Sequence, residues 1–299
     1  MTLTAIVVTF AVGLIAGLLS GLVGIGGGVL MVPFLYFFYD RPEWFGVAVP
    51  MDLRVVVAHA TSLFVIVPTS VRGVVAFHGA RLVEWRAVWP IGLASVFAAV
   101  IAARLALFFP PEILKFLFGT FLVVSGLRLA KRRPATEPGA EAAPLRLSWK
   151  VTVPIGITVG AFSALLGVGG GVVTIPLLMY VVRLDVRKIA ATSIAIIAIT
   201  ATAGTLTYMA MGLGHPGLPV GSIGYVHAVV GVAMFVGAVL SVRSGAMLNQ
   251  RLKPRMLNLV FAVLFVVIGI RLVVASAWIL GQRPGPAPLV SYTEAWVQR

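Results

Sequence analysis

Two glycine-rich blocks hold the residues of this sequence whose types and spacing could bind a ligand. The first covers residues 17–35 and reads GLLSGLVGIGGGVLMVPFL, and the second, 143 residues later, covers residues 160–178 and reads GAFSALLGVGGGVVTIPLL. Ten of the 19 positions are identical. Because each glycine cluster interrupts an apolar run, we interpret the two blocks as a pair of broken helices.

The backbone at such a break could bind an anion, since unpaired N–H groups at the start of the following helix would face whatever lies there. The alternative is that the glycines only allow helices to pack closely. Because the cluster occurs twice, each time with a serine at the same position, we favour a binding site. Its candidate residues are Ser20, Gly24, Gly26, Gly27 and Gly28 in the first block and Ser163, Gly167, Gly169, Gly170 and Gly171 in the second.

A nucleotide-binding loop is not supported, because no βαβ pattern surrounds the glycines and no Lys-Ser/Thr pair follows them. We therefore expect no cofactor. The nine acidic residues all lie in loops, linker or tail, and the sequence has no cysteine and no histidine-rich cluster. These features argue against a metal site and against a cation as cargo, and they favour an anion or a neutral molecule.

Hydroxyl side chains recur in the next apolar segment of each half. Residues 60–62 read Ala-Thr-Ser, and the same triplet returns at residues 191–193. We expect these hydroxyls to line a cavity, although each could instead bond to the backbone one turn earlier. The candidates are Thr61, Ser62, Thr69, Ser70, Thr192 and Ser193.

Two ionisable residues lie in the same segment of the first half. Arg72 could bind an anion or act in gating, because ionisable groups within membrane segments are usually functional; its long side chain could equally extend to the membrane interface. His59, two residues before Thr61, could donate to a substrate or carry a coupling proton. Arg72 is replaced by Ala203 in the second half, so any anion site is asymmetric in charge.

The elements that position these residues are membrane helices. Of the 299 residues, 60% are hydrophobic and only 11% charged, with a mean hydropathy of +1.06, whereas soluble domains have about 25% charged residues. Apolar segments long enough to cross a bilayer recur along the chain, and they cover residues 3–39, 55–77, 87–109, 113–130, 151–182, 189–212, 222–248 and 256–280. The sequence predicts an all-α polytopic membrane protein.

The net charge of +14 has a topological explanation. The basic residues cluster at the ends of apolar segments, as the positive-inside rule predicts for cytoplasmic loops, so the lipid bilayer is the expected partner and nucleic acid is not. With eight crossings, 11 loop Lys and Arg residues fall on each side. With ten crossings, in which each broken segment crosses and returns, 15 fall on one side and 7 on the other. The second topology is therefore favoured.

Ten crossings predict two inverted repeats of about five membrane helices each, with the glycine-broken helices meeting near the midplane and both termini outside the cytoplasm. The predicted parts are repeat 1 at residues 1–130, a polar cytoplasmic linker at 131–147, repeat 2 at 148–280 and a polar tail at 281–299. Residues 29–39 and 172–183 are short for full spans, so re-entrant helices are the alternative. Helical breaks that meet in this way are typical of transporters with inverted repeats.

The ordered, duplicated set of motifs resembles the TauE/SafE sulfite exporter family of bacterial membrane proteins. The resemblance covers residues 5–275 and rests on the glycine blocks, the Ala-Thr-Ser blocks, and the matching ends Gly-Leu-Arg-Leu at 126–129 and Gly-Ile-Arg-Leu at 269–272. It implies a multi-pass protein of the bacterial inner membrane that exports or takes up sulfite or small organosulfonates such as sulfoacetate.

From these observations we expect a secondary transporter of a small anionic substrate, acting by alternating access as one half rocks against the other. A homodimer is left open. The alternatives are a transporter of another small anion or of a neutral solute, and an intramembrane enzyme. The enzyme is the weakest of these, because His59 with Ser62 or Thr61 would be its only acid-base and nucleophile pair, without a carboxylate to orient the histidine.

Overall fold

A computed structural model of the protein describes residues 2–79, 81–130, 145–249 and 254–282. The predicted linker lies outside the described residues except for its last three positions, and the predicted tail except for its first two. In the first half the helices are α1 (Leu3–Val23), α2 (Gly28–Asp40), α3 (Pro42–Phe45), α4 (Arg54–His78), α5 (Trp85–Ala106) and α6 (Pro111–Ala130). In the second half they are α7 (Trp149–Leu166), α8 (Gly171–Leu177) continued by a π-helical turn η1 (Leu178–Val182), α9 (Val186–Met211), α10 (Ala228–Asn249) and α11 (Pro254–Gln282).

The predicted all-α membrane architecture is confirmed. Six of the described helices are long and apolar enough to cross a membrane, namely α1, α4, α5, α7, α9 and α10. The predicted segment 222–248 is wrong at its start, where two short antiparallel strands, β1 (Ser222–Ile223) and β2 (Val226–His227), precede α10. Gly221 and Gly224 both have positive φ angles, of 84° and 56°, so the chain turns here instead of continuing as a helix.

The helices pack in pairs that each join the two halves of the chain. The closest pairs are α1 with α10, α5 with α7, α6 with α11, and α4 with α9. Exchanging the halves converts the first pair into the second and leaves the other two pairs unchanged. Small residues allow this close approach: a Cβ at Gly17 of α1 would overlap the backbone of Ala238 on α10, and one at Gly160 of α7 would overlap the backbone of Ser95 on α5.

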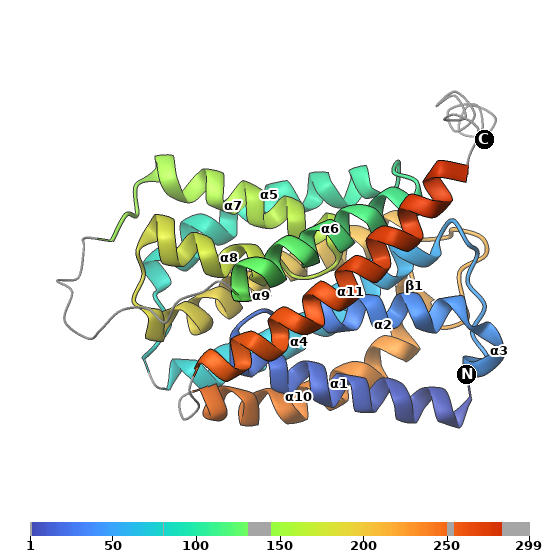
Figure 1. The fold of residues 1–299 in the computed structure, drawn as a ribbon, viewed down its shortest axis with the longest axis horizontal. Coiled ribbons are helices and arrows are strands. Elements are labelled where there is room, and N and C mark those ends of the chain that lie inside the picture. The colour runs from blue at the N-terminus through green and yellow to red at the C-terminus, as the bar shows by residue number, and fades with distance from the viewer. Residues whose placement is uncertain (1, 80, 131–144, 250–253, 283–299) are drawn as a thin grey trace.

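Figure 1 shows how these pairs are arranged. The pair α5–α7 lies at the top and α1–α10 at the bottom, while α6 and α11 cross the front of α2, α4, α8 and α9. Helices α1, α4 and α6 run from right to left, whereas α7, α9 and α11 run from left to right. Counterpart helices thus run in opposite directions, in keeping with the predicted inverted repeat, which stays our interpretation.

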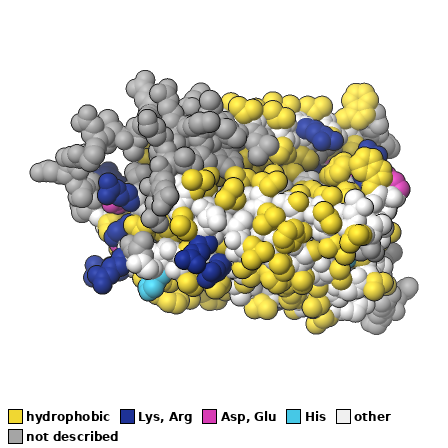
Figure 2. All heavy atoms as spheres, turned by 90° about the horizontal axis from the view of Figure 1, so that it is seen from below, with side chains coloured by type: hydrophobic (Ala, Val, Ile, Leu, Met, Phe, Trp, Pro, Cys, Tyr) yellow, Lys and Arg dark blue, Asp and Glu magenta, His cyan; other side chains and the backbone are white. Residues whose placement is uncertain are grey.

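The outer surface is apolar over much of its area. Figure 2 shows a face with a broad region of hydrophobic side chains and most of its visible Lys and Arg side chains to one side of that region. Large apolar side chains such as Phe97, Trp149 and Val274 are exposed. In water such a surface would aggregate, whereas in a bilayer it faces acyl chains.

Candidate functional site

Both glycine blocks break a helix in the same way. At the first break Gly24 ends α1 with φ = 81°, and Gly27 precedes α2 with φ = 76°. At the second, Gly167 ends α7 with φ = 66°, and Gly170 precedes α8 with φ = 80°. These left-handed conformations are strained for residues with a Cβ. The repeated glycines are therefore needed for the backbone path itself.

The two breaks contact each other inside the protein. A Cβ at Gly28 would lie 2.7 Å from the Cα of Val168, and one at Gly171 would lie 2.6 Å from the Cα of Ile25. Backbone from the first break thus touches backbone from the second. The prediction that the broken helices meet is confirmed, and their meeting brings residues 143 positions apart into one place.

Each break also packs on the long central helix of the other half. Gly24 lies against Ala190 of α9, and Gly167 lies against His59 of α4. The hydroxyl of Ser193 on α9 donates to the carbonyl oxygen of Gly24 at 2.9 Å. The corresponding hydroxyl on α4, that of Ser62, has no hydrogen-bond partner among the described residues. The two breaks are alike in backbone and different in polar contacts.

Two isoleucines that the sequence analysis did not single out close the space between the breaks. Ile66 of α4 and Ile197 of α9 are fully buried, and both contact Gly26 and Gly169. The methyl groups lie 3.0–3.7 Å from where a Cβ at these glycines would stand. The offset of 131 residues that relates Thr61 to Thr192 also relates these isoleucines, so the repeat itself was the signal that could have found them.

Five buried polar atoms near the breaks have no hydrogen-bond partner among the described residues. They are the hydroxyl oxygens of Ser20, Ser62, Ser70 and Ser163 and the Nδ1 atom of His59. An unpartnered buried polar group costs about 1–3 kcal/mol, so five together are an unusual concentration. A ligand with hydrogen-bonding atoms would satisfy them.

The positions of these atoms follow from the helices that present them. Ser20 lies one turn before Gly24, and Ser163 lies one turn before Gly167. Ser62, Ile66 and Ser70 are spaced by four residues, which places them on one face of α4. Because Ile66 contacts both breaks, the two serines flank that contact along the helix.

Other predicted hydroxyls already have protein partners. Thr61 accepts a hydrogen bond from the backbone N–H of His227 at 3.0 Å, and Thr192 accepts one from the backbone N–H of Glu84 at 3.1 Å. Thr69 donates to the carbonyl of Val65 at 2.7 Å, which is the backbone alternative considered above. The structure therefore gives these threonines a role in holding helices and loops, and does not bring their hydroxyls together as an open cavity lining.

Arg72 is not brought to the breaks. Its side chain is exposed, as are those of Val71 and Val75 on the same helix, whereas the buried Gly73 faces Ile194 of α9. This placement agrees with the alternative in which the arginine extends along the outer surface to the membrane interface. A role for Arg72 as an anion ligand at the breaks is thus not supported by its position.

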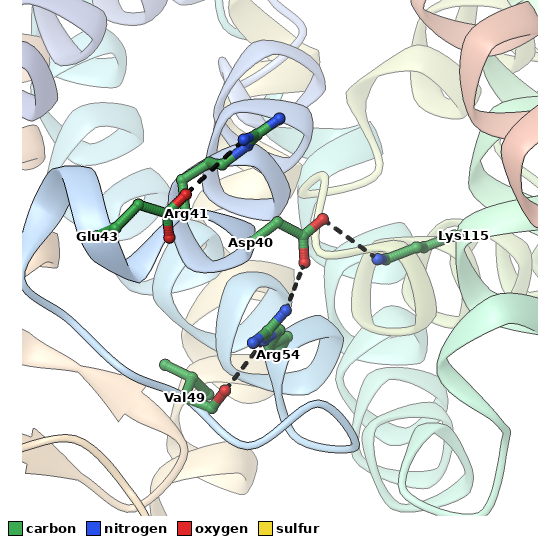
Figure 3. A network of polar contacts seen from close by, with 6 residues as sticks. All are labelled: Asp40, Arg41, Glu43, Val49, Arg54 and Lys115. Carbon is green, nitrogen blue, oxygen red and sulfur yellow. Dashed lines mark hydrogen bonds and ion pairs between the residues drawn. The ribbon is translucent and has the colours of Figure 1, made fainter.

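Several polar residues that the sequence analysis did not identify lie next to His59 or are linked to it through Tyr36. The hydroxyl of Tyr36 on α2 shares a hydrogen bond with Nε2 of His59, and the Nζ atom of Lys115 on α6 lies 5.4 Å from the centre of the Tyr36 ring. Asp40 binds Lys115 at 3.8 Å and Arg54 at 3.1 Å (Figure 3). The one signal available in the sequence was a lysine inside an apolar segment.

The contact between Ser193 and Gly24 gives a first prediction. Changing Ser193 to alanine should lower stability by about 1 kcal/mol, because one buried hydrogen bond is lost. Thermal unfolding in detergent, followed by size-exclusion chromatography, measures the effect as a fall in midpoint of about 2 °C or more. Ser62→Ala is the matched control, and it should not lower the midpoint since the Ser62 hydroxyl has no partner in the part of the chain that the structure describes. Equal losses in both variants would contradict the assigned contact.

The sequence was also compared with known proteins. Residues 9–272 match the family model described as Sulfite exporter TauE/SafE. A probable membrane transporter protein of Methanocaldococcus jannaschii is 30% identical, over 87% of this chain and 92% of its own. Probable membrane transporter proteins of Bacillus subtilis and Haemophilus influenzae are each 26% identical, covering 89% and 90% of this chain and 97% and 98% of theirs. No solved structure matches the chain.

The family match extends from α1 into α11 and thus includes both breaks and all the helix pairs. The relatives match over 92%, 97% and 98% of their own lengths, so the similarity is not confined to one part of the chain. With six apolar helices long enough to cross a bilayer, this multi-pass membrane protein belongs to the TauE/SafE sulfite exporter family of membrane transporters.

Proposed function

We propose that the protein is a secondary transporter that exports small sulfur-containing anions, sulfite or organosulfonates such as sulfoacetate, across the plasma membrane of a bacterial cell. The observation that carries this proposal is the set of serine hydroxyls around two touching helix breaks that find no hydrogen-bond partner within the described ranges. The family description supplies the substrate class.

The chemistry of the site suits a sulfur oxyanion. Sulfite and sulfonates present three oxygen atoms that accept hydrogen bonds, and serine hydroxyls can donate to them. Ser20 and Ser163 would reach the anion from the two breaks, and Ser62 and Ser70 from α4. The nine acidic residues lie outside these four positions and outside both glycine blocks, so no carboxylate of the blocks would repel an anion.

Alternating access would require the space between the breaks to open to one side at a time. In the described structure Ile66 and Ile197 fill this space. The two central helices, α4 and α9, each have an ion pair at or near their start. Asp40 joins α2 to Arg54 at the start of α4, and Glu84 joins the start of α5 to Lys188 on α9 at 3.0 Å. These starts lie at opposite ends of the molecule in Figure 1. We infer that one set of contacts opens while the other stays closed.

The moving parts would not be the two sequence halves. Helix α1 packs closely along α10 and α5 along α7, through glycines that admit backbone contact. Separating such pairs would expose tightly packed backbone, which is costly. We therefore propose that the pairs α1–α10 and α5–α7 each move as one body around α2, α4, α8 and α9.

Flux measurements in proteoliposomes test the proposed function. The purified full-length chain should catalyse saturable movement of radiolabelled sulfite, competed by sulfoacetate, at rates above those of protein-free liposomes. Nitrate and a neutral sugar serve as comparison solutes. Absence of sulfite and sulfonate flux, or flux of only the comparison solutes, would overturn the proposal and select the corresponding alternative.

A further inference from the structure

We propose that His59 is a proton-binding site that couples anion transport to protons, so that one proton moves in the same direction as the anion. This inference rests on the proposed function. It adds the coupling ion, which neither the family nor the relatives specify.

His59 lies at the second break with one ring nitrogen unsatisfied. A Cβ at Gly167 would stand 2.5 Å from the Cα of His59 and 2.8 Å from its Cβ, so helix α4 touches the break at this residue. Nε2 is engaged by the hydroxyl of Tyr36, whereas Nδ1 is buried and has no partner among the described residues. Ser62, three residues later, lies on the same face of α4. The histidine is thus placed beside the proposed anion ligands.

The titratable pair exists in only one half of an otherwise matched structure. The positions that correspond to Tyr36 and His59 are Met179 and Ala190, and Ala190 contacts Gly24 just as His59 contacts Gly167. Two residues later the halves keep an equivalent contact, because Thr61 and Thr192 each accept a hydrogen bond from the backbone before α10 and α5. His59 thus differs from its counterpart Ala190 in side chain, although both keep the same contact with a glycine of a break. This difference points to a function that the His59 side chain alone performs. One such group per chain predicts one proton per cycle.

Three neighbouring helices place charged or titratable groups around the pair Tyr36 and His59. Tyr36 comes from α2, and Lys115 of α6 lies over the Tyr36 ring. Tyr208 of α9 donates its hydroxyl proton to the carbonyl of Ala164 at 2.9 Å and is therefore already engaged. The ammonium group of Lys115 opposes a second positive charge on His59 when the site is empty. A bound anion offsets that repulsion, so that binding of the anion and of the proton favour each other.

Polar groups lead from His59 toward the protein surface. The Tyr36 hydroxyl shares a hydrogen bond with His59, the ammonium group of Lys115 lies over the Tyr36 ring, and Lys115 is paired with Asp40, whose side chain is 44% exposed (Figure 3). His59 would take one proton from water at whichever ring nitrogen is vacant in the neutral tautomer. The imidazolium then donates from Nε2 to the Tyr36 oxygen and from Nδ1 to the anion. The same proton leaves to water with the anion on the other side, and no other bond changes.

The test compares the response of net transport to a pH gradient with exchange at equal pH, using the full chain in proteoliposomes. The ratio of net sulfite flux driven by the gradient to sulfite-sulfite exchange is measured for the wild type and for His59→Asn. We expect the ratio to fall at least tenfold in the variant. Protonation of sulfite itself changes with pH in the same way for both proteins. It therefore does not contribute to the difference in ratio between the wild type and His59→Asn.

His227→Asn is the matched control. His227 is also buried, and its ring lies 3.4 Å from a tyrosine hydroxyl, that of Tyr39, in the short strand β2 that precedes α10. Its ratio should equal that of the wild type. A wild-type ratio in His59→Asn, or an equal loss in both histidine variants, would overturn the inference.

Tyr36→Phe covers the case in which His59→Asn does not fold. This variant keeps the aromatic ring and removes only the hydroxyl, and it should lower the same ratio severalfold. An unchanged ratio in Tyr36→Phe would overturn the proposed role of the Tyr36–His59 pair in proton binding. If the wild type moves no sulfur anion under any gradient, the proposed function fails instead, and that result is distinguishable from all of these.

Discussion

Replacing Ser20 and Ser163 together with alanine should weaken anion binding at least 100-fold while leaving the protein as stable as before or more so. A hydrogen bond to a charged group contributes about 1.5–3 kcal/mol, and each 1.4 kcal/mol changes the dissociation constant about tenfold. Two lost hydroxyl donors therefore predict this loss. The concentration of sulfite at half-maximal exchange in proteoliposomes measures it.

The opposite direction of the stability effect makes this prediction specific. Both hydroxyls are fully buried and have no hydrogen-bond partner among the described residues. Removing a buried hydroxyl without a partner relieves a desolvation cost of about 1–3 kcal/mol. The thermal midpoint of the double variant should therefore be equal to or above that of the wild type. A fall in both stability and transport would mean that the serines act by packing.

Thr9 and Thr152 provide a matched control pair on the same helices. Each lies 11 residues before one of the two serines and is buried. Their hydroxyls donate to carbonyls one turn earlier, those of Ala5 at 2.7 Å and Ser148 at 3.3 Å. Changing both to valine removes these local bonds without touching the breaks. Transport of the control should keep the wild-type affinity, and a loss equal to that of the serine pair would contradict the proposed site.

Local signals in the sequence were sufficient for much of the architecture. Long apolar runs predict spanning helices because every backbone group must bond within its own segment in lipid, and α4, α5 and α9 follow the predicted segments 55–77, 87–109 and 189–212 within about four residues. The glycine clusters predicted breaks because each interrupts an apolar run, and in the structure three residues of each cluster have positive φ angles. The duplication then predicted that the breaks would meet, as they do.

The polar contacts of the site could not be predicted in the same way. Thr61 meets the backbone of a residue 166 positions away, and such a partner depends on tertiary packing, which no local pattern encodes. The placement of Arg72 depends on which side of α4 faces outward. The sequence could not show this, because α4 has polar residues on both its buried and its exposed sides. In the sequence Lys115 is a lysine within an apolar segment, and no pattern connects it or Tyr36 with His59. Only the fold brings them to His59.

Substitution of Gly24 by alanine should prevent the protein from folding to a stable transporter, with an expected loss of more than about 3 kcal/mol. The left-handed backbone accounts for about 1–2 kcal/mol of this loss. The remainder comes from overlap, because the new Cβ would lie 2.7 Å from the Cα and 2.8 Å from the carbonyl oxygen of Ala190. Backbone atoms of a packed helix cannot move aside as a flexible side chain can.

Alanine variants of three other glycines distinguish the cost of the left-handed backbone from the cost of the overlap. Gly79 ends α4 with φ = −59° and has no atom within 4 Å of a new Cβ, so Gly79→Ala should be neutral. Gly214 has φ = 73° and the same open space, so its alanine variant should lose only the backbone term. Gly171 has no positive φ, but its Cβ would meet the backbone of Ile25 in the other break. Its alanine variant should therefore lose only the packing term.

Size-exclusion profiles and thermal midpoints of the four variants in detergent give the comparison. We expect the order Gly79→Ala above Gly214→Ala, with Gly171→Ala lower and Gly24→Ala lowest. A stable Gly171→Ala variant that still catalyses exchange would mean that the breaks can separate without loss, and the contact between them would then not be needed for function. If instead Gly171→Ala folds but transports nothing, the meeting of the two breaks is required for anion movement itself, because the change adds one methyl group where backbone touches backbone and leaves every serine hydroxyl in place.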